Sequence, residues 1–131
     1  HVARVIAPAM QANGWGRIVN LTGAMVAPAP NAAAPAQAAL QSWSRSLSLQ
    51  LAPHGVTVNT IAPGRIATEQ IRNKLHPTEE SRRAFIDRFI PAGRFGEPEE
   101  LAVVAVFLAS PLAGYVNGAA IPVDGAMTRI G

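Results

Sequence analysis

Three short apolar runs, separated by segments long enough to form helices, constrain the fold of this chain most strongly. The runs are RIVNLT at 17–22, VTVNTIAPG at 56–64 and AAIPVDG at 119–125. Glycine bounds the first run on both sides and a Pro-Gly pair ends the second, which is typical of strands buried in a sheet. Strands joined by helical crossovers pair in parallel. The sequence therefore predicts an α/β fold in which three parallel strands are covered by helices.

The segments around these runs carry the periodicity of amphipathic helices. Apolar residues recur at helical spacing over 2–10 and over 36–51. A third helix is predicted over 78–90 with Thr78 as its N-cap, and a fourth begins near Pro98. We expect the fourth helix to bury one apolar stripe, made of Leu101, Val104, Phe107 and Leu108.

The composition is consistent with one globular domain, 1–131. Hydrophobic residues make up 49% of the chain and charged residues 15%, a balance that favours a packed core over disorder. The net charge of +3 comes with arginines that are spread along the chain, so we expect no nucleic-acid partner. The uncharged stretch between Arg17 and Arg45 contains polar residues and prolines, which argues against a membrane span.

Four motifs follow one another along the chain: GRIVNLTG, LAPHGVTVNTIAPGRIAT, GRFGEPEELAVVAVFLAS and YVNGAAIPVDG. Their order and spacings are similar to those of the short-chain dehydrogenase/reductase family. The resemblance implies the C-terminal part of a doubly wound, Rossmann-like parallel sheet. It also implies NAD or NADP as the cofactor, and hydride transfer between nicotinamide and a carbonyl or alcohol carbon.

The first half of the family pattern has no counterpart in this sequence. In the family, a Gly-rich turn between a strand and a helix lets the backbone approach the pyrophosphate. The glycines of NGWGRIV precede a strand instead, so they do not fit that context. We therefore expect a partial domain that comes from a longer protein and does not bind the dinucleotide by itself.

The catalytic serine, tyrosine and lysine of the family are also missing from the matching positions, where Gly23, Ala33 and Gln37 stand. In the family the tyrosine hydroxyl is the general acid or base, and the lysine lowers its pKa from the ordinary phenol value of about 10. Alanine has no proton to donate and glutamine has no charge. The resemblance therefore implies no catalytic residue in this chain. We expect the neighbouring Thr22 to bond to the backbone or the core rather than to replace the serine.

One cofactor-contacting element of the family has a counterpart, the segment PGRIAT. By resemblance, Pro63, Gly64, Ile66 and Thr68 would lie along the nicotinamide carboxamide. The alternative is a turn that only ends the strand. No metal site is expected, because His1, His54 and His76 lack ligand spacing, and Tyr115 is expected to pack rather than to catalyse.

Three hypotheses for the function remain open. The chain is part of a nicotinamide-dependent oxidoreductase that is inactive as this chain alone, a non-catalytic subunit for oligomerisation or partner binding, or a decaying gene product. The helices over 1–13 and 36–51, and the last helix and strand, match family surfaces that commonly form dimers and tetramers. We expect a cytoplasmic homo-oligomer, or a complex with the missing N-terminal half, rather than a stable monomer.

Overall fold

The computed structural model of the chain describes residues 2–23 and 32–128. His1 and the part of the uncharged stretch at 24–31 lie outside the described residues. The elements are α1 (Val2–Ala12), β1 (Gly16–Leu21), α2 (Ala33–Leu51), β2 (Val56–Pro63), α3 (Glu79–Phe89), α4 (Pro98–Ala109) and β3 (Ala120–Val123), with short helical turns η1 (Ala52–His54), η2 (Ile71–Leu75) and η3 (Pro111–Ala113). The predicted helices and strands are therefore all present. None of the helices in the described part is long and apolar enough to cross a membrane.

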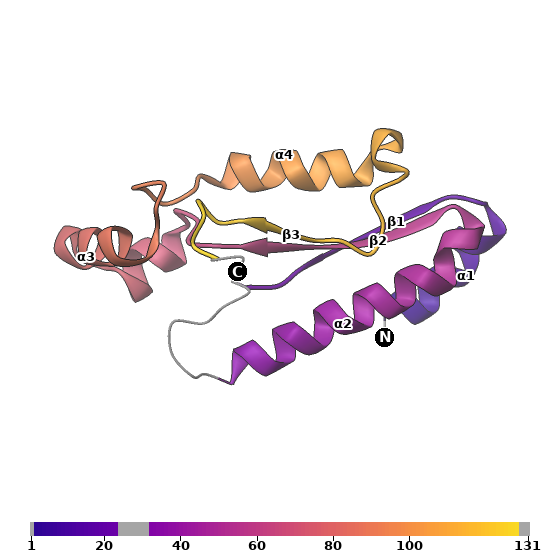
Figure 1. Ribbon diagram of the computed structural model, residues 1–131, viewed down its shortest axis with the longest axis horizontal. Coiled ribbons are helices and arrows are strands. Elements are labelled where there is room, and N and C mark those ends of the chain that lie inside the picture. Colours follow the sequence, from indigo (N-terminus) through magenta and orange to yellow (C-terminus); the bar gives the residue numbers. More distant parts are fainter. Residues whose placement is uncertain (1, 24–31, 129–131) are drawn as a thin grey trace.

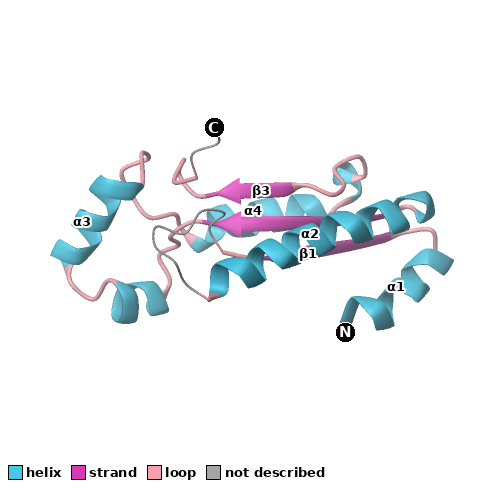
Figure 2. Ribbon diagram, turned by 60° about the horizontal axis from the view of Figure 1, so that its bottom comes forward, coloured by secondary structure: helices cyan, strands magenta, loops and turns pink. Residues whose placement is uncertain are grey.

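The strands form one parallel sheet in the order β1-β2-β3, as predicted (Figure 2). Gly16 is paired with Val56 at the start of β1, and Thr60 with Ala120 at the start of β3. Because the strands are parallel, their carboxyl ends meet at one edge of the sheet. Among the described residues, β1 pairs with β2 alone, so its other edge is open.

Helices cover both faces of the sheet and bury its central strand. Figure 1 shows α4 on one face and α1 and α2 on the other, while α3 lies beyond the carboxyl ends of the strands. Every residue of β2 except the last is buried. Side chains of β2 alternate between the faces: Val56 and Val58 belong to the core on the α1–α2 side, and Ile61 packs with Leu108 below α4.

Two asparagine side chains attach the loop before β3 to the central strand. The side chain of Asn59 donates to the carbonyl oxygen of Val116 at 2.7 Å and accepts from the backbone N–H of Ala119 at 3.0 Å. Asn117 Oδ1 accepts from the backbone N–H of Val58 at 2.8 Å. Since buried backbone groups need partners, these bonds fix where β3 begins.

The starts of α3 and α4 have side-chain caps. Thr78 is the N-cap of α3 and accepts from the backbone N–H of Ser81, as its position in the sequence predicts. At α4, Glu100 accepts from the backbone N–H of Glu97 at 2.8 Å and from the Arg94 guanidinium at 2.6 and 2.7 Å. These bonds, that from Arg94 foremost, lower the pKa of Glu100 to about 2.

Two sequence expectations about packing are wrong. Phe107 does not belong to the buried stripe of α4, because 44% of its surface is exposed whereas Leu108 is fully buried. A helix that is apolar on most sides does not reveal from periodicity which side meets the sheet. Tyr115 is fully exposed rather than packed, since it lies in the turn after η3, where the smaller Ala113 occupies the core.

Candidate functional site

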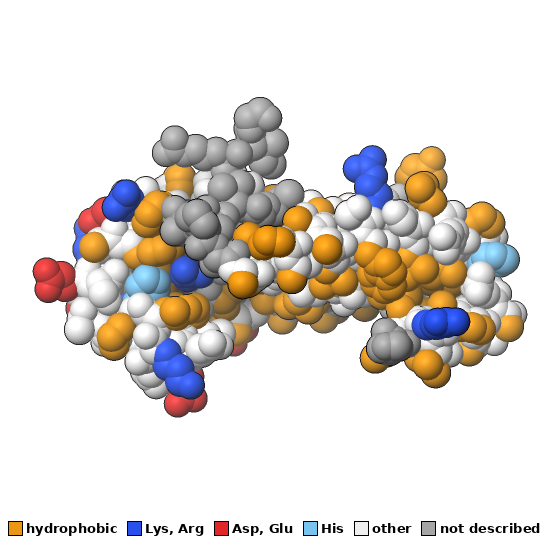
Figure 3. Space-filling view, turned by 90° about the horizontal axis from the view of Figure 1, so that it is seen from below, with side chains coloured by type: hydrophobic (Ala, Val, Ile, Leu, Met, Phe, Trp, Pro, Cys, Tyr) orange, Lys and Arg blue, Asp and Glu red, His pale blue; other side chains and the backbone are white. Residues whose placement is uncertain are grey.

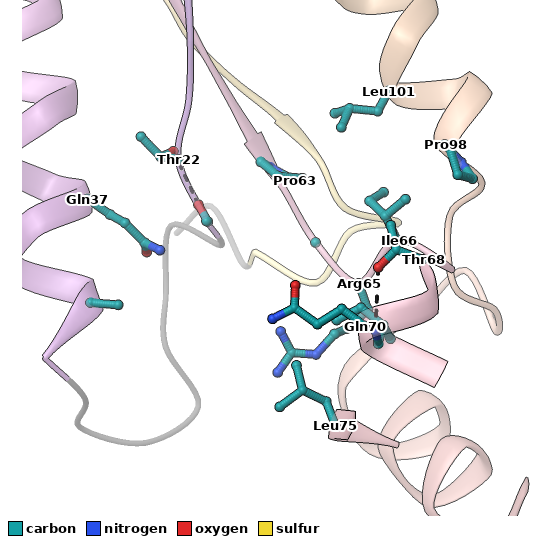
Figure 4. A pocket seen from close by; sticks show the side chains of 14 residues that line it. Thr22, Gln37, Pro63, Arg65, Ile66, Thr68, Gln70, Leu75, Pro98 and Leu101 are labelled. Carbon is teal, nitrogen blue, oxygen red and sulfur yellow. Dashed lines mark hydrogen bonds between the residues drawn. The ribbon is translucent and has the colours of Figure 1, made fainter. Parts of the chain in front are cut away.

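A pocket of about 780 Å³ opens at the carboxyl ends of β1 and β2 (Figure 4). Its walls come from the residues that follow the two strands, the first turns of α2 and α4, and the turn η2. The lining residues are Thr22, Gly23, Ala33, Gln37, Pro63, Gly64, Arg65, Ile66, Thr68, Gln70, Ile71, Leu75, Pro98 and Leu101. All seven positions that the resemblance singles out, three catalytic and four cofactor-contacting, therefore border one cavity.

The segment after β2 is held in place by backbone bonds on both sides. Gly64 N–H donates to the carbonyl oxygen of Val123 at 3.0 Å. A Cβ atom on Gly64 would lie 2.7 Å from the Cα of Asp124, so only glycine permits this close approach. On the other side, Ala67 N–H donates to the carbonyl oxygen of Gly96 at 2.7 Å. These bonds place the segment between the end of β3 and the chain before α4.

The neighbouring side chains of this segment point in different directions. Figure 4 shows Ile66 and Thr68 on the side of α4, near Leu101. Ile66 is buried. Thr68 Oγ1 accepts from the N–H of Ile71 at 3.4 Å, at the start of η2. Two of the predicted cofactor-contacting residues therefore also have structural contacts: Ile66 is buried in the protein, and Thr68 bonds to the start of η2.

The three positions that match the family's catalytic residues lie on the opposite wall of the pocket. Gly23 follows β1, Ala33 begins α2, and Gln37 lies one turn later. A Cβ atom on Gly23 would lie 2.8 Å from Cδ and 2.9 Å from Oε1 of Gln37. The Gln37 carboxamide thus fills the space that a side chain at position 23 would need.

Thr22 is bonded to its surroundings, as expected from the sequence. Its hydroxyl lies 3.3 Å from the carbonyl oxygen of Gly23 and 3.4 Å from that of Ile61. The same oxygen accepts from Gln41 Nε2 at 3.3 Å. These contacts engage the hydroxyl with the backbone and α2.

Arg65 lines the pocket and was not singled out in the sequence. Its guanidinium carbon lies 4.7 Å from the centre of the Phe85 ring, and its buried Nε atom has no hydrogen-bond partner. Burial lowers the pKa of Arg65 from its ordinary value, but an arginine remains charged at neutral pH. One sequence signal was available: Arg65 is the single charged residue between 56 and 68.

Aromatic side chains behind Arg65 hold His76. The His76 ring lies 4.6 Å from that of Phe85 and 5.5 Å from that of Phe95. Burial lowers the pKa of His76, and the positive charges of Arg65 and Arg82 lower it further. No cluster of potential metal ligands occurs in the described ranges 2–23 and 32–128.

Comparison with known proteins agrees with this architecture. The family model described as enoyl-(acyl carrier protein) reductase matches residues 1–128. The short-chain reductase protein NovJ of Streptomyces niveus is 39% identical over 123 residues, which cover 88% of this chain and 46% of NovJ. The 3-oxoacyl-[acyl-carrier-protein] reductase FabG of Pseudomonas aeruginosa is 42% identical over 117 residues, which cover 86% of this chain and 45% of FabG.

Solved structures show the same relation. A gluconate 5-dehydrogenase from Burkholderia cenocepacia, in complex with NADP and tartrate, superposes with a TM-score of 0.85 at 32% identity. The match covers 96% of this chain and 50% of that protein. YwfH, an NADPH-dependent reductase of bacilysin biosynthesis, gives a TM-score of 0.86 at 33% identity, with 97% and 52% coverage. The chain thus spans about half the length of the relatives it matches, and it belongs to the short-chain dehydrogenase/reductase family.

Proposed function

We propose that this chain forms the C-terminal half of a nicotinamide-dependent oxidoreductase fold whose pocket binds a small molecule without catalysing carbonyl reduction. One observation carries the proposal. The positions that match the catalytic residues border the same cavity as PGRIAT, and they carry glycine, alanine and glutamine. The pocket is retained, and the groups that would transfer a proton in it are replaced.

Gly23 and Gln37 are neighbours in the pocket, and neither has the side chain that the family has at its position. A serine at position 23 would meet the carboxamide of Gln37, and Gln37 stands where the family has its lysine. General acid–base catalysis contributes typically about 10²–10⁴-fold to a rate. Because Thr22 is engaged by the backbone and Gln41, it does not supply the missing proton transfer.

The residues present fit only one end of a dinucleotide. The walls at Pro63, Ile66 and Thr68 could accept a flat nicotinamide ring, and the family resemblance assigns them to its carboxamide. The pyrophosphate site of the family is a Gly-rich turn at a helix N-terminus, and this sequence has no such turn. We therefore expect nicotinamide contacts without tight binding of NAD or NADP by this chain.

The proposal is tested by absorbance assays of NADH and NADPH oxidation with ketones, aldehydes and acetoacetyl thioesters. We expect no turnover above a protein-free control. Turnover that disappears in Thr22→Val would show that Thr22 acts in place of the missing groups and would overturn the proposal. Fluorescence titration with NADH and NADPH measures cofactor binding separately. A dissociation constant in the low micromolar range would reveal a cofactor site that the pocket residues do not explain.

A second function, in assembly, is favoured by an apolar groove along the open edge of β1. The groove lies between α1 and α2 and is lined by Val2, Ala3, Ile6, Arg17, Ile18, Val19, Asn20 and Trp43. Figure 3 shows hydrophobic side chains gathered on this face. An unpaired strand edge beside exposed apolar side chains favours association. We propose that a second copy, or a chain with the remaining half of the fold, covers it.

Light scattering after size exclusion tests assembly of this chain. We expect a mass above the 13.7 kDa of one chain. Trp43→Lys places a charge in the groove and should shift the mass towards the monomer. Leu49→Lys is the matched control, because Leu49 is exposed on the same helix but lies outside the groove. A monodisperse monomer with a concentration-independent thermal transition would contradict self-association.

A further inference from the structure

Among the described residues, the Arg65 guanidinium has no anionic partner. No described residue forms an ion pair with it or accepts a hydrogen bond from it, and its Nε atom is buried without a partner. Other arginines of this region are paired: Arg94 binds Glu100, and Arg82 binds Glu79. A partly buried cation without a counter-ion is costly, so an anion that enters the pocket would be stabilised there.

The geometry leaves the guanidinium free to bind such an anion. One face of the guanidinium lies over the Phe85 ring at 4.7 Å, which holds the group in position through a cation–π contact. The hydrogen-bond donors of a guanidinium point outward in its plane, so stacking does not block the edge formed by the two Nη groups, whereas Nε is buried. A carboxylate matches that edge with two parallel hydrogen bonds.

The direction of the side chain assigns the anion to the side of the reacting positions. Figure 4 shows the Arg65 guanidinium beside the Gln70 carboxamide, facing the space towards Gln37, whereas Ile66 and Thr68 lie on the side of α4. The family resemblance places the nicotinamide along Ile66 and Thr68. The side that faces Gln37 is therefore the place of a ligand other than the nicotinamide cofactor.

The remaining walls describe the rest of this ligand. Among the described residues that line the pocket, Arg65 is the one with a charge, and the lining contains no aspartate or glutamate. Most of the others are apolar, including Pro63, Leu75 and Leu101. Gln37 and Gln70 add amides that can donate and accept hydrogen bonds. A ligand that fits these walls has a mainly apolar body and one carboxylate.

We propose that Arg65 is the recognition residue of a carboxylate subsite, and that the pocket binds small monocarboxylates with an apolar body. The inference rests on the proposed function, because it names the ligand class of the same pocket. It requires no turnover and no nicotinamide cofactor. Its test can therefore fail while the absence of catalysis stands, and the reverse also holds.

The test is an NMR titration of the ¹⁵N-labelled chain with hexanoate, and with hexanamide as the uncharged match. We expect hexanoate to shift the Arg65 Nε–H signal and to bind at least about tenfold more tightly than hexanamide, as a charge-assisted bidentate pair should. Arg65→Met should weaken hexanoate binding by a similar factor and leave hexanamide unaffected. Arg65→Lys should fall between, since it keeps the charge and loses the planar edge.

Arg88→Met is the matched control variant. The Arg88 guanidinium also lies over a phenylalanine ring, 5.1 Å from the centre of Phe89, but it does not line the pocket. Hexanoate binding should be unchanged in this variant. The amide spectrum and the thermal midpoint of each variant report whether it is folded. If Arg65→Met does not fold, the hexanoate affinity of Arg65→Lys is compared with that of the parent chain instead.

Several results would overturn the proposal. Equal binding of hexanoate and hexanamide, or no hexanoate binding at its highest soluble concentration, would show that no carboxylate subsite exists. If both Arg65 variants bound hexanoate as tightly as the parent chain, Arg65 would not be part of the carboxylate subsite. A titration with nicotinamide mononucleotide distinguishes the other source of an oxyanion: if this phosphate shifts the Arg65 signal and hexanoate does not, Arg65 recognises the cofactor instead.

Discussion

Replacing Asn59 with alanine tests the link between the central strand and the loop that leads into β3. Asn59 is fully buried in β2, and its side chain bonds the carbonyl oxygen of Val116 and the N–H of Ala119. Alanine would leave both backbone groups without a partner. An unsatisfied buried group costs about 1–3 kcal/mol. Because Val116 and Ala119 are half-buried, we expect the low end of this range for each, or about 2 kcal/mol together. For a chain of this size each kcal/mol lowers the thermal midpoint by roughly 3–5 °C.

The next residue along β2 supplies a control of opposite sign. Thr60 is 1% exposed, and its hydroxyl has no hydrogen-bond partner. Valine has nearly the same shape without the hydroxyl, so Thr60→Val removes an unsatisfied group and leaves no other group unpaired. We expect its stability to be unchanged or increased. Both substitutions alter a buried polar side chain in the same strand, and only Asn59→Ala breaks bonds to the loop.

Thermal unfolding followed by far-UV circular dichroism, at equal protein concentrations, measures both variants. We expect Asn59→Ala to lower the midpoint by at least about 6 °C. Hydrogen exchange should locate the change, because the amide of Ala119 loses its acceptor in this variant. Equal shifts in the two variants, or retained protection at Ala119, would refute the assignment of these bonds.

Three further changes test other parts of the structure. The pKa of Glu100 is held at about 2, below its ordinary value of 4.5. The carboxylate therefore contributes fully to stability above about pH 4.5, and this contribution is lost as the pH falls towards 2. The difference in thermal midpoint between the parent chain and Glu100→Gln should disappear over that range, and a constant difference would contradict this. Ala126 has a φ of 66°, so Ala126→Gly should raise the midpoint by relieving a strain of about 1–2 kcal/mol, less the entropy that glycine adds to the unfolded chain. Gly64→Ala should lower the thermal midpoint, since the added Cβ atom would meet Asp124 at an overpacking cost of about 1–3 kcal/mol. An unchanged midpoint would show that the end of β3 does not pack closely against Gly64.

Local signals in the sequence account for the parts of the fold that were predicted. The β-branched runs and their glycine and proline boundaries predicted the three strands, and parallel pairing then placed their carboxyl ends together. This is why Gly23 and Gly64, 41 residues apart, could be expected at one site. The threonine at 78 and the proline at 98 predicted the starts of α3 and α4, since capping depends on residues within one turn.

The parts that were missed depend on contacts between distant segments. Arg65 gains its role from Phe85, twenty residues later, and from the lack of an ion-pair partner among the described residues. Phe107 and Leu108 are adjacent apolar residues, and only the position of α4 on the sheet separates the exposed one from the buried one. The bonds of Asn59 to the loop before β3 likewise join residues 57 and 60 positions apart.

Gly23, Ala33 and Gln37 form an uncharged wall of the pocket. Gln37 fills the space beside Gly23, so a serine restored at position 23 alone would have to displace its carboxamide. A lysine restored at position 37 alone would add a second cation to a pocket that already has Arg65. Neither single change leads back to an acid–base site, whereas each leaves the charge of Arg65 in place. On the function proposed above, we expect this wall to recognise a ligand by shape and Arg65 to recognise it by charge, without a group that transfers a proton.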